Sequence, residues 1–466
     1  MGSNNSVIHN LSDKKISSLF WQYALPAIIG ISINTLSNII NGVFIGYWVG
    51  NSALSASGLV LPIMNLTIAF GVLVGIGAAS RLSICLGSKD NERAQKIVGA
   101  TGVLSLLLNG LTIVCLLYFM RPILEMAGAS DATYPYARDF LVVFLPGSII
   151  TSLALGYNNL MRASGYPLKA MITMFISVIA NIILAPIFIL WFDWGMKGAA
   201  LATTLSMTIS FVFVMLHFTD KKRELRLSWK NLRLDVGTVK SIVSIGMAPF
   251  FIQVGASVIV MLINNQLKHY APVAGITIDD AIAGYANTNR LLTFVVMVVI
   301  GVNQGMQPII GYNYGAKNYD RVRQTLWYAV AVATCFTTAG FVLGVFFPAF
   351  FVRMFTPDPE IIRVSAFILR NMSLAFVLVG FQMAVSGFFQ CIGMARVSIF
   401  LSLTRQVIIL IPALLILPVY LGLDGVVYAV PVADVLATLL TGYIFYRQLI
   451  VLRLEHAKVQ SRNFVH

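Results

Sequence analysis

The chain has 466 residues, of which 58% are apolar and only 11% are charged. A soluble domain carries about 25% charged residues, so this composition excludes a soluble enzyme, a disordered chain and a secreted disulfide-rich scaffold. Lys and Arg exceed Asp and Glu, which gives a formal net charge of +14. In so apolar a chain this excess is typical of basic loops beside an anionic membrane surface, and no motif favours a nucleic-acid partner.

Apolar segments of about 20 residues, each long enough to cross a bilayer, recur along the whole chain. We predict an all-α polytopic membrane protein with twelve transmembrane helices, arranged as two parallel-related six-helix lobes with a central cleft. Prolines interrupt several segments and are expected to bend them or to line cavities. The predicted spans are 18–46, 53–84, 95–119, 136–160, 169–191, 198–218, 240–267, 281–311, 324–350, 362–391, 397–420 and 425–447.

Lysines and arginines concentrate in alternate loops, most densely in the connector between the sixth and seventh spans. By the positive-inside rule, this connector and both chain termini are cytoplasmic. The predicted parts are a cytoplasmic N-terminal segment, an N-lobe with helices 1–6, a basic connector, a C-lobe with helices 7–12 and a cytoplasmic tail. The N-terminal segment covers residues 1–17 and the N-lobe 18–218. The connector covers 219–239, the C-lobe 240–447 and the tail 448–466.

The two halves of the chain resemble each other at a nearly constant offset. Segment Gly77–Arg93 lies over Gly305–Arg321, Gly165 over Gly393, and Gly195 over Gly422. Such internal similarity is the mark of a duplicated unit. Because each half has an even number of spans, both halves have the same orientation, and a substrate site is expected near the middle of the membrane. Rocking of the lobes would expose the cleft to each side in turn.

Segment Gly305–Val322 resembles the most recognisable signature of the MATE family (multidrug and toxic compound extrusion). Segments Phe44–Gly46, Arg162–Gly165 and Gly195–Thr203 agree with it. The resemblance covers nearly the whole chain and is greatest to the bacterial MepA-like branch. It implies a secondary antiporter of the plasma (inner) membrane that exports small amphipathic molecules, often organic cations, in exchange for protons or sodium ions. We expect a monomer whose partners are its substrate and the lipid bilayer.

The sequence departs from the family at two positions of the N-lobe. The family usually carries acidic residues where this chain has Asn41 and Ala185, while Asn181 and Thr203 match their polar partners. An amide does not titrate near neutral pH, so Asn41 does not replace a carboxylate in proton coupling. Asn41 could still offer an oxygen to a sodium ion or a hydrogen bond to the substrate.

Asp434 is the one acidic residue well inside a predicted span. An ionisable group at that depth is costly and is expected to have a partner. The best candidate is Arg405 in the preceding span, because helices joined by a short loop usually pack together. Two roles are open. The pair is either a permanent link between two helices, or an ion-coupling switch in which Asp434 releases Arg405 when it binds a proton or a sodium ion.

Other polar residues within the spans are candidates for the substrate cleft. Arg290 either extends toward the membrane surface or faces the cleft, where it would favour an anionic group. Asn34, Asn38 and Asn41 share one helical face, which either lines the cleft or bonds to a neighbouring helix. The remaining candidates are Asn158, Asn159, Asn181, Thr203, Gln253, Asn264, Tyr285, Gln304, Gln307 and Gln382.

Two further classes of transporter compete with a MATE-type exporter. A lipid-linked precursor flippase of the same superfamily would tend to have a strongly cationic cavity, and a major-facilitator transporter would have a Gly- and Arg-rich loop after its second span. Neither feature is present. No catalytic or nucleotide-binding motif is found, and the four cysteines lie in or beside apolar segments. We therefore predict no enzyme, no cofactor and no metal, and a proton or sodium gradient as the energy source.

Overall fold

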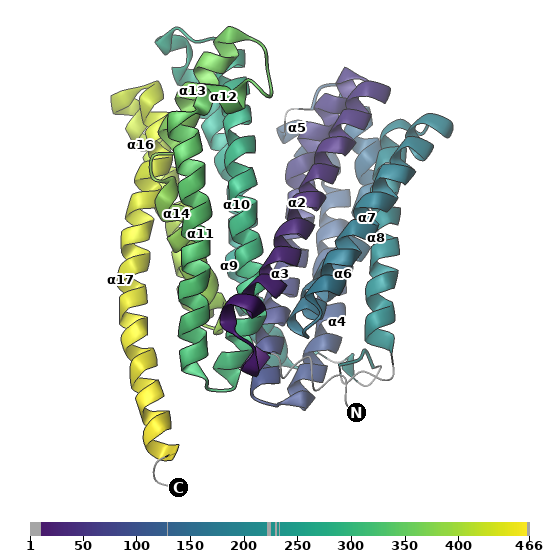
Figure 1. Cartoon of the computed structure of the whole chain (residues 1–466). Helices are drawn as coiled ribbons and strands as arrows, with labels where there is room; N and C mark the ends of the chain where they lie inside the picture. The colour runs from purple at the N-terminus through teal and green to yellow at the C-terminus, as the bar shows by residue number, and fades with distance from the viewer. Residues whose placement is uncertain (1–10, 128, 221–224, 229–230, 233, 464–466) are drawn as a thin grey trace. The chain divides into compact units, whose positions relative to one another are not determined.

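The computed structural model describes residues 11–463 except 128, 221–224, 229–230 and 233, and no side chain at 38, 51, 54 or 452–463. This part of the chain is helical and has no strand. Its contacts group it into two compact units, which are drawn in Figure 1. Unit 1 comprises Leu25–Gln253 and the chain before Ile16, and unit 2 comprises Ile16–Ala24 and the chain from Val254 onward.

Unit 1 is a bundle of long helices, among which α3 packs against α6 and α6 packs against α8. Helix α2 (Ile16–Trp48) enters this unit at Leu25, and α9 (Val236–Tyr270) leaves it after Gln253. The helices between them are α3 (Asn51–Gly87), α4 (Asn91–Tyr118), the short α5 (Met120–Met126), α6 (Tyr134–Ala163), α7 (Pro167–Pro186), the π-helical η1 (Ile187–Trp191) and α8 (Gly195–Thr219).

Unit 2 holds the rest of α9 and the remaining helices, and α11 runs beside α14 within it (Figure 1). These helices are η3 (Pro272–Ala274), α10 (Ile278–Gly315), α11 (Tyr319–Phe346), α12 (Pro348–Val352), α13 (Pro359–Met372), α14 (Phe376–Cys391), α15 (Ala395–Leu403), the π-helical η4 (Thr404–Leu410), α16 (Ile411–Leu421) and α17 (Leu423–Asn463).

The helices have the length and composition of membrane spans. In the described part of the chain, eleven are long and apolar enough to cross a bilayer, and there are twelve if α13 and α14 form one span. That pair is bent by 53° between Met372 and Phe376. The predicted all-helical fold with twelve spans is therefore confirmed, with the tenth span broken into two helices.

Several prolines lie within continuous helices. Pro26, Pro62 and Pro146 lie inside helices that continue through them. The chain widens into a π-helix at two other prolines, directly after Pro186 and directly before the turn that holds Pro412. A proline removes one backbone donor and displaces the carbonyl one turn earlier, and a π-helical turn can absorb this disturbance without ending the span.

Short polar side chains begin several helices. The Asp90 carboxylate accepts a hydrogen bond from the backbone amide of Arg93, and Thr277 accepts one from the amide of Asp280. At the start of α9, outside the span, Asp235 accepts hydrogen bonds from the hydroxyl and amide of Thr238, which lower the pKa of this carboxyl. These caps satisfy amides that have no partner within the helix.

The duplication is visible in the backbone. Lys89 and Lys317, which correspond in the repeat, are both left-handed with φ of 59° and 61°. Few non-glycine residues adopt this conformation, so its recurrence at matched positions indicates the same turn in both halves. Matched glycines behave alike, because Gly165 and Gly393 both have positive φ.

Glycines let two helices of unit 1 cross almost backbone to backbone. A Cβ atom on Gly246 of α9 would lie 1.9 Å from the carbonyl oxygen of Leu73 on α3. One on Gly77 would lie 2.1 Å from the carbonyl oxygen of Ile242. Both distances are far below any van der Waals contact, so this crossing requires glycine on both helices. It fixes the first half of α9 to unit 1.

Candidate functional site

An ion pair lies inside the apolar helices of unit 2. Arg405 stands in η4, and its Nε donates a hydrogen bond of 2.7 Å to Oδ1 of Asp434 on α17. The Asp434 side chain is only 3% exposed, while that of Arg405 is 24% exposed. The tight turn between α16 and α17 brings the two segments side by side. The carboxylate is thus the buried partner, and the guanidinium retains access to the surface.

Only one oxygen of the Asp434 carboxylate takes part in this ion pair. Oδ2 of Asp434 is buried and has no hydrogen-bond partner among the described residues. The nearby hydroxyl of Thr438 donates to the backbone carbonyl of Asp434 instead. A bidentate arginine–carboxylate pair would use both oxygens and would be stronger than this single contact. The second oxygen is therefore a position where a proton could bind without displacing an existing hydrogen bond.

Unit 1 has an uncharged contact at the corresponding positions. Ser177 and Met207 match Arg405 and Asp434 in the repeat, and the Ser177 hydroxyl lies 3.4 Å from the Met207 sulfur. Neither of these side chains can exchange a proton near neutral pH. Of these two matched contacts, the one in unit 2 is the one that contains ionisable side chains.

Two of the polar residues predicted for an N-lobe ion site, Asn181 and Thr203, are within weak hydrogen-bond distance of each other. Asn181, which is buried, lies with its Nδ2 3.4 Å from the hydroxyl oxygen of Thr203, and its Oδ1 has no partner among the described residues. Ala185 belongs to the apolar core of the unit, and Asn41 is half-buried on α2. This group offers amide and hydroxyl oxygens without a carboxylate.

A buried cation, Arg162, lies in unit 1, two residues beyond the predicted span 136–160. Arg162 is 3% exposed. It donates to the side-chain oxygens of Asn158 at 3.1 Å and of Asn159 at 3.4 Å. Asn158 also donates to the carbonyl of Ala170 and to the hydroxyl of Thr173. Asn158 and Asn159 precede Arg162 by one helical turn. This spacing in the sequence could have predicted that the two amides accept hydrogen bonds from the guanidinium.

The other predicted polar residues are spread over both units. Gln382 is buried and Asn264 is half-buried, and each has an amide oxygen without a partner among the described residues. Arg290 is exposed on α10. The side chain of Asn38 lies outside the described residues. Tyr285 and Gln307 are buried, and the half-buried residues are Asn34, Gln253 and Gln304.

These features define a class of protein. A helical chain with eleven or twelve membrane-crossing helices, an internal duplication and a few polar groups buried within those helices is a polytopic membrane transporter. A family model described as MatE matches residues 26–187 and 248–415, which is more than half of the chain. The chain belongs to the MATE family, whose members are ion-coupled transporters.

Relatives and solved structures agree with this assignment. The multidrug export protein MepA of Staphylococcus haemolyticus is 29% identical over 439 residues, covering 93% of this chain and 94% of that protein. MepA of Staphylococcus aureus is 28% identical, covering 91% and 92%. A crystal structure of a MATE protein in the bent conformation has a TM-score of 0.89 at 23% identity and covers 97% of this chain and 99% of that one.

Proposed function

We propose that this protein exports amphipathic small molecules in exchange for an ion that moves inward, and that Asp434 is its coupling carboxylate. The related exporters named for multidrug export support the direction and the breadth of substrates, and do not favour a lipid-linked precursor flippase. The observation that supports the coupling role is the buried carboxylate of Asp434 in unit 2. Its Oδ1 accepts a hydrogen bond from Arg405, and its Oδ2 has no partner among the described residues.

A proton is the proposed coupling ion. Protonation of Oδ2 removes the negative charge that holds Arg405, and the partly exposed guanidinium is then free to move away from the carboxyl group. Loss of the bond between η4 and α17 changes how the last two spans pack. Return of the proton to the cytoplasm restores the pair. This cycle links one titration to two arrangements of neighbouring helices, which is what a coupled transporter requires.

The remaining parts of the proposal follow from the sequence pattern. The distribution of basic residues supports cytoplasmic termini, and the bacterial relatives support the plasma (inner) membrane as the location. The duplication supports alternating access by the two predicted lobes, 18–218 and 240–447, within a monomer. We propose that the polar residues predicted for the substrate cleft contact the substrate wherever they face that cleft.

The decisive experiment is efflux of ethidium from proteoliposomes under an imposed proton gradient. The test variant is Asp434→Asn, which keeps the size of the side chain and removes its titration. The matched control is Asp139→Asn, which makes the same chemical change in an exposed pair with Lys197. We expect efflux driven by the gradient to fall to the level of empty liposomes in the first variant and to stay at the wild-type level in the control.

Two results would contradict the proposal. Proton-driven efflux by a correctly folded Asp434→Asn variant at the wild-type rate would remove Asp434 from the coupling path. Wild-type efflux that responds to a sodium gradient and ignores a proton gradient would make sodium the coupling ion. Each variant must be shown by gel filtration to be monodisperse before its transport is compared.

A further inference from the structure

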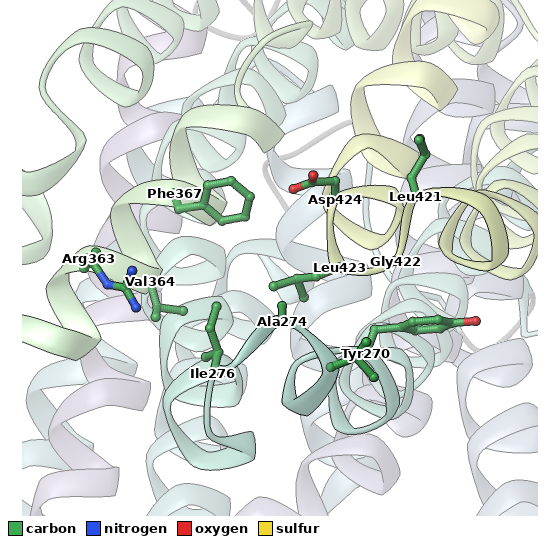
Figure 2. A pocket seen from close by; sticks show the side chains of 11 residues that line it. Tyr270, Ala274, Ile276, Arg363, Val364, Phe367, Leu421, Gly422, Leu423 and Asp424 are labelled. Atoms are coloured by element: carbon green, nitrogen blue, oxygen red, sulfur yellow. The ribbon is translucent and has the colours of Figure 1, made fainter.

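A cavity of about 480 Å³ opens at the end of unit 2 that carries the turn between α16 and α17. It lies between the end of α9 with the loop that follows, the first turns of α13 and that turn (Figure 2). The volume is within the usual range for small-molecule sites. Its lining residues are Tyr270, Val273, Ala274, Ile276, Arg363, Val364, Phe367, Leu421, Gly422, Leu423 and Asp424.

The walls of this cavity are mainly apolar and aromatic. Phe367 and Tyr270 contribute ring surfaces, and Val364 and Leu423 contribute buried aliphatic surface. A ligand with an apolar body would remove this surface from water, and the gain scales with the area covered. The lining therefore suits an aromatic or aliphatic molecule better than a strongly hydrated one.

The lining holds one residue of each charge, Arg363 and Asp424, and among the described residues only Arg363 has an ion-pair partner. Arg363 bonds to both carboxylate oxygens of Glu360, so that pair is neutral. Asp424 has no hydrogen-bond or ion-pair partner among the described residues. In Figure 2 its carboxylate points toward the ring of Phe367. A carboxylate and the negative face of an aromatic ring each attract an organic cation.

The position of Asp424 is set by the backbone around it. Gly422 has positive φ, and its amide bonds to the carbonyl of Pro418 at 2.8 Å. A Cβ on Gly425 would lie 2.4 Å from the backbone of Leu417, so the turn is packed tightly. The turn therefore fixes the backbone of Asp424 at the edge of the cavity, and only the exposed side chain has to be ordered when a ligand binds.

This cavity is separate from the ion pair that carries the proposed coupling. Asp424 and Asp434 are ten residues apart on α17, a rise of about 15 Å along the helix. Apolar core side chains occupy the bundle between them, including Val427, Tyr285 and Leu414. A ligand in the cavity would therefore not contact Asp434.

We propose that this cavity is a binding site for amphipathic organic monocations. The apolar and aromatic walls take the body of the ligand, and Asp424 with Phe367 takes its charge. The inference does not depend on the role of Asp434, and it predicts binding whether or not the ligand is transported.

The test is photoaffinity labelling of the purified full-length protein with a benzophenone derivative of triphenylphosphonium, with tetraphenylphosphonium as competitor. Mass spectrometry should find label in peptides that contain residues 270–276, 363–367 or 421–424. Asp424→Asn and Phe367→Leu should each weaken competition about threefold, because an exposed charge pair and a cation–π contact are each worth a fraction of a kilocalorie to one kilocalorie. Ala274→Trp should fill the cavity and abolish labelling there.

Two controls separate this result from other effects. Asp131→Asn makes the same change at an exposed residue of unit 1 and should leave labelling unchanged. Asp434→Asn should also keep the label, so a failure of the coupling proposal would not be mistaken for a failure of this one. Labelling that persists in Ala274→Trp, that falls only on other segments, or that vanishes when the protein is moved from detergent into lipid nanodiscs would overturn the proposal.

Discussion

Replacing the two members of the buried ion pair should destabilise the protein by unequal amounts. In Arg405→Met the carboxylate of Asp434 stays buried, 3% exposed, and Oδ1 loses its partner, so neither oxygen is then hydrogen-bonded. Leaving a buried charge without its partner costs about 3–5 kcal/mol. In Asp434→Asn the side-chain oxygen of asparagine can still accept the hydrogen bond from Nε of Arg405, whose side chain is 24% exposed, so the expected cost is nearer 1–3 kcal/mol.

The double variant Arg405→Met with Asp434→Leu separates a structural link from a switch. Replacing a buried ion pair by apolar side chains of similar volume is often neutral or stabilising, so this variant should be about as stable as the wild type. The two single changes should therefore be strongly non-additive, as expected for residues in direct contact. The measurement is thermal unfolding followed by intrinsic fluorescence in detergent, with all variants heated at one rate because unfolding can be irreversible.

Transport by the same three variants gives the second half of the test. If the pair couples the proton to export, the double variant folds like the wild type and still shows no proton-driven efflux of ethidium. Normal efflux by the double variant would show that the pair only joins the two helices. A single variant Arg405→Met that is no less stable than Asp434→Asn would refute the reasoning from burial.

Three further predictions test other parts of the molecule. Gly246→Ala should lower the unfolding temperature, because its Cβ would force the crossing of α9 and α3 apart by more than 1 Å, whereas Gly110→Ala, with open space beside it, should not. Asn158→Ala should also lower that temperature, because Arg162 and two further groups would lose a partner in the interior. Asn41→Asp with Ala185→Asp should add a second pH dependence to ethidium efflux, and an unchanged pH profile would refute a role for those positions.

Hydropathy predicted the positions of the spans well, because each must present about 20 apolar residues to lipid. It did not predict where a span breaks. The 53° bend between α13 and α14 falls at Ser373–Ala375, a stretch without proline or glycine, while several prolines sit in helices that continue. The break depends on how the helix ends pack within unit 2, and that information is not local in the sequence.

Burial of polar groups was harder to predict than their presence. Arg162 was counted with the cytoplasmic cations because the predicted span ended at residue 160. Helix α6 continues to Ala163, and the arginine lies inside. Its charge is accommodated by amide oxygens from its own helix. A count of charges by loop cannot distinguish a solvated arginine from one that a neighbouring turn of polar residues keeps in the interior.

The duplication explains why only one of the two matched helix pairs is a good candidate for coupling. The repeat places Ser177 beside Met207 in unit 1 and Arg405 beside Asp434 in unit 2. A neutral contact costs little to bury and does not respond to pH, whereas the charged one must offset a large desolvation cost. That cost is incurred in one copy only. A link between helices does not require charges, as the neutral contact in unit 1 shows, so the charged pair in unit 2 is the reason to look for the proton there.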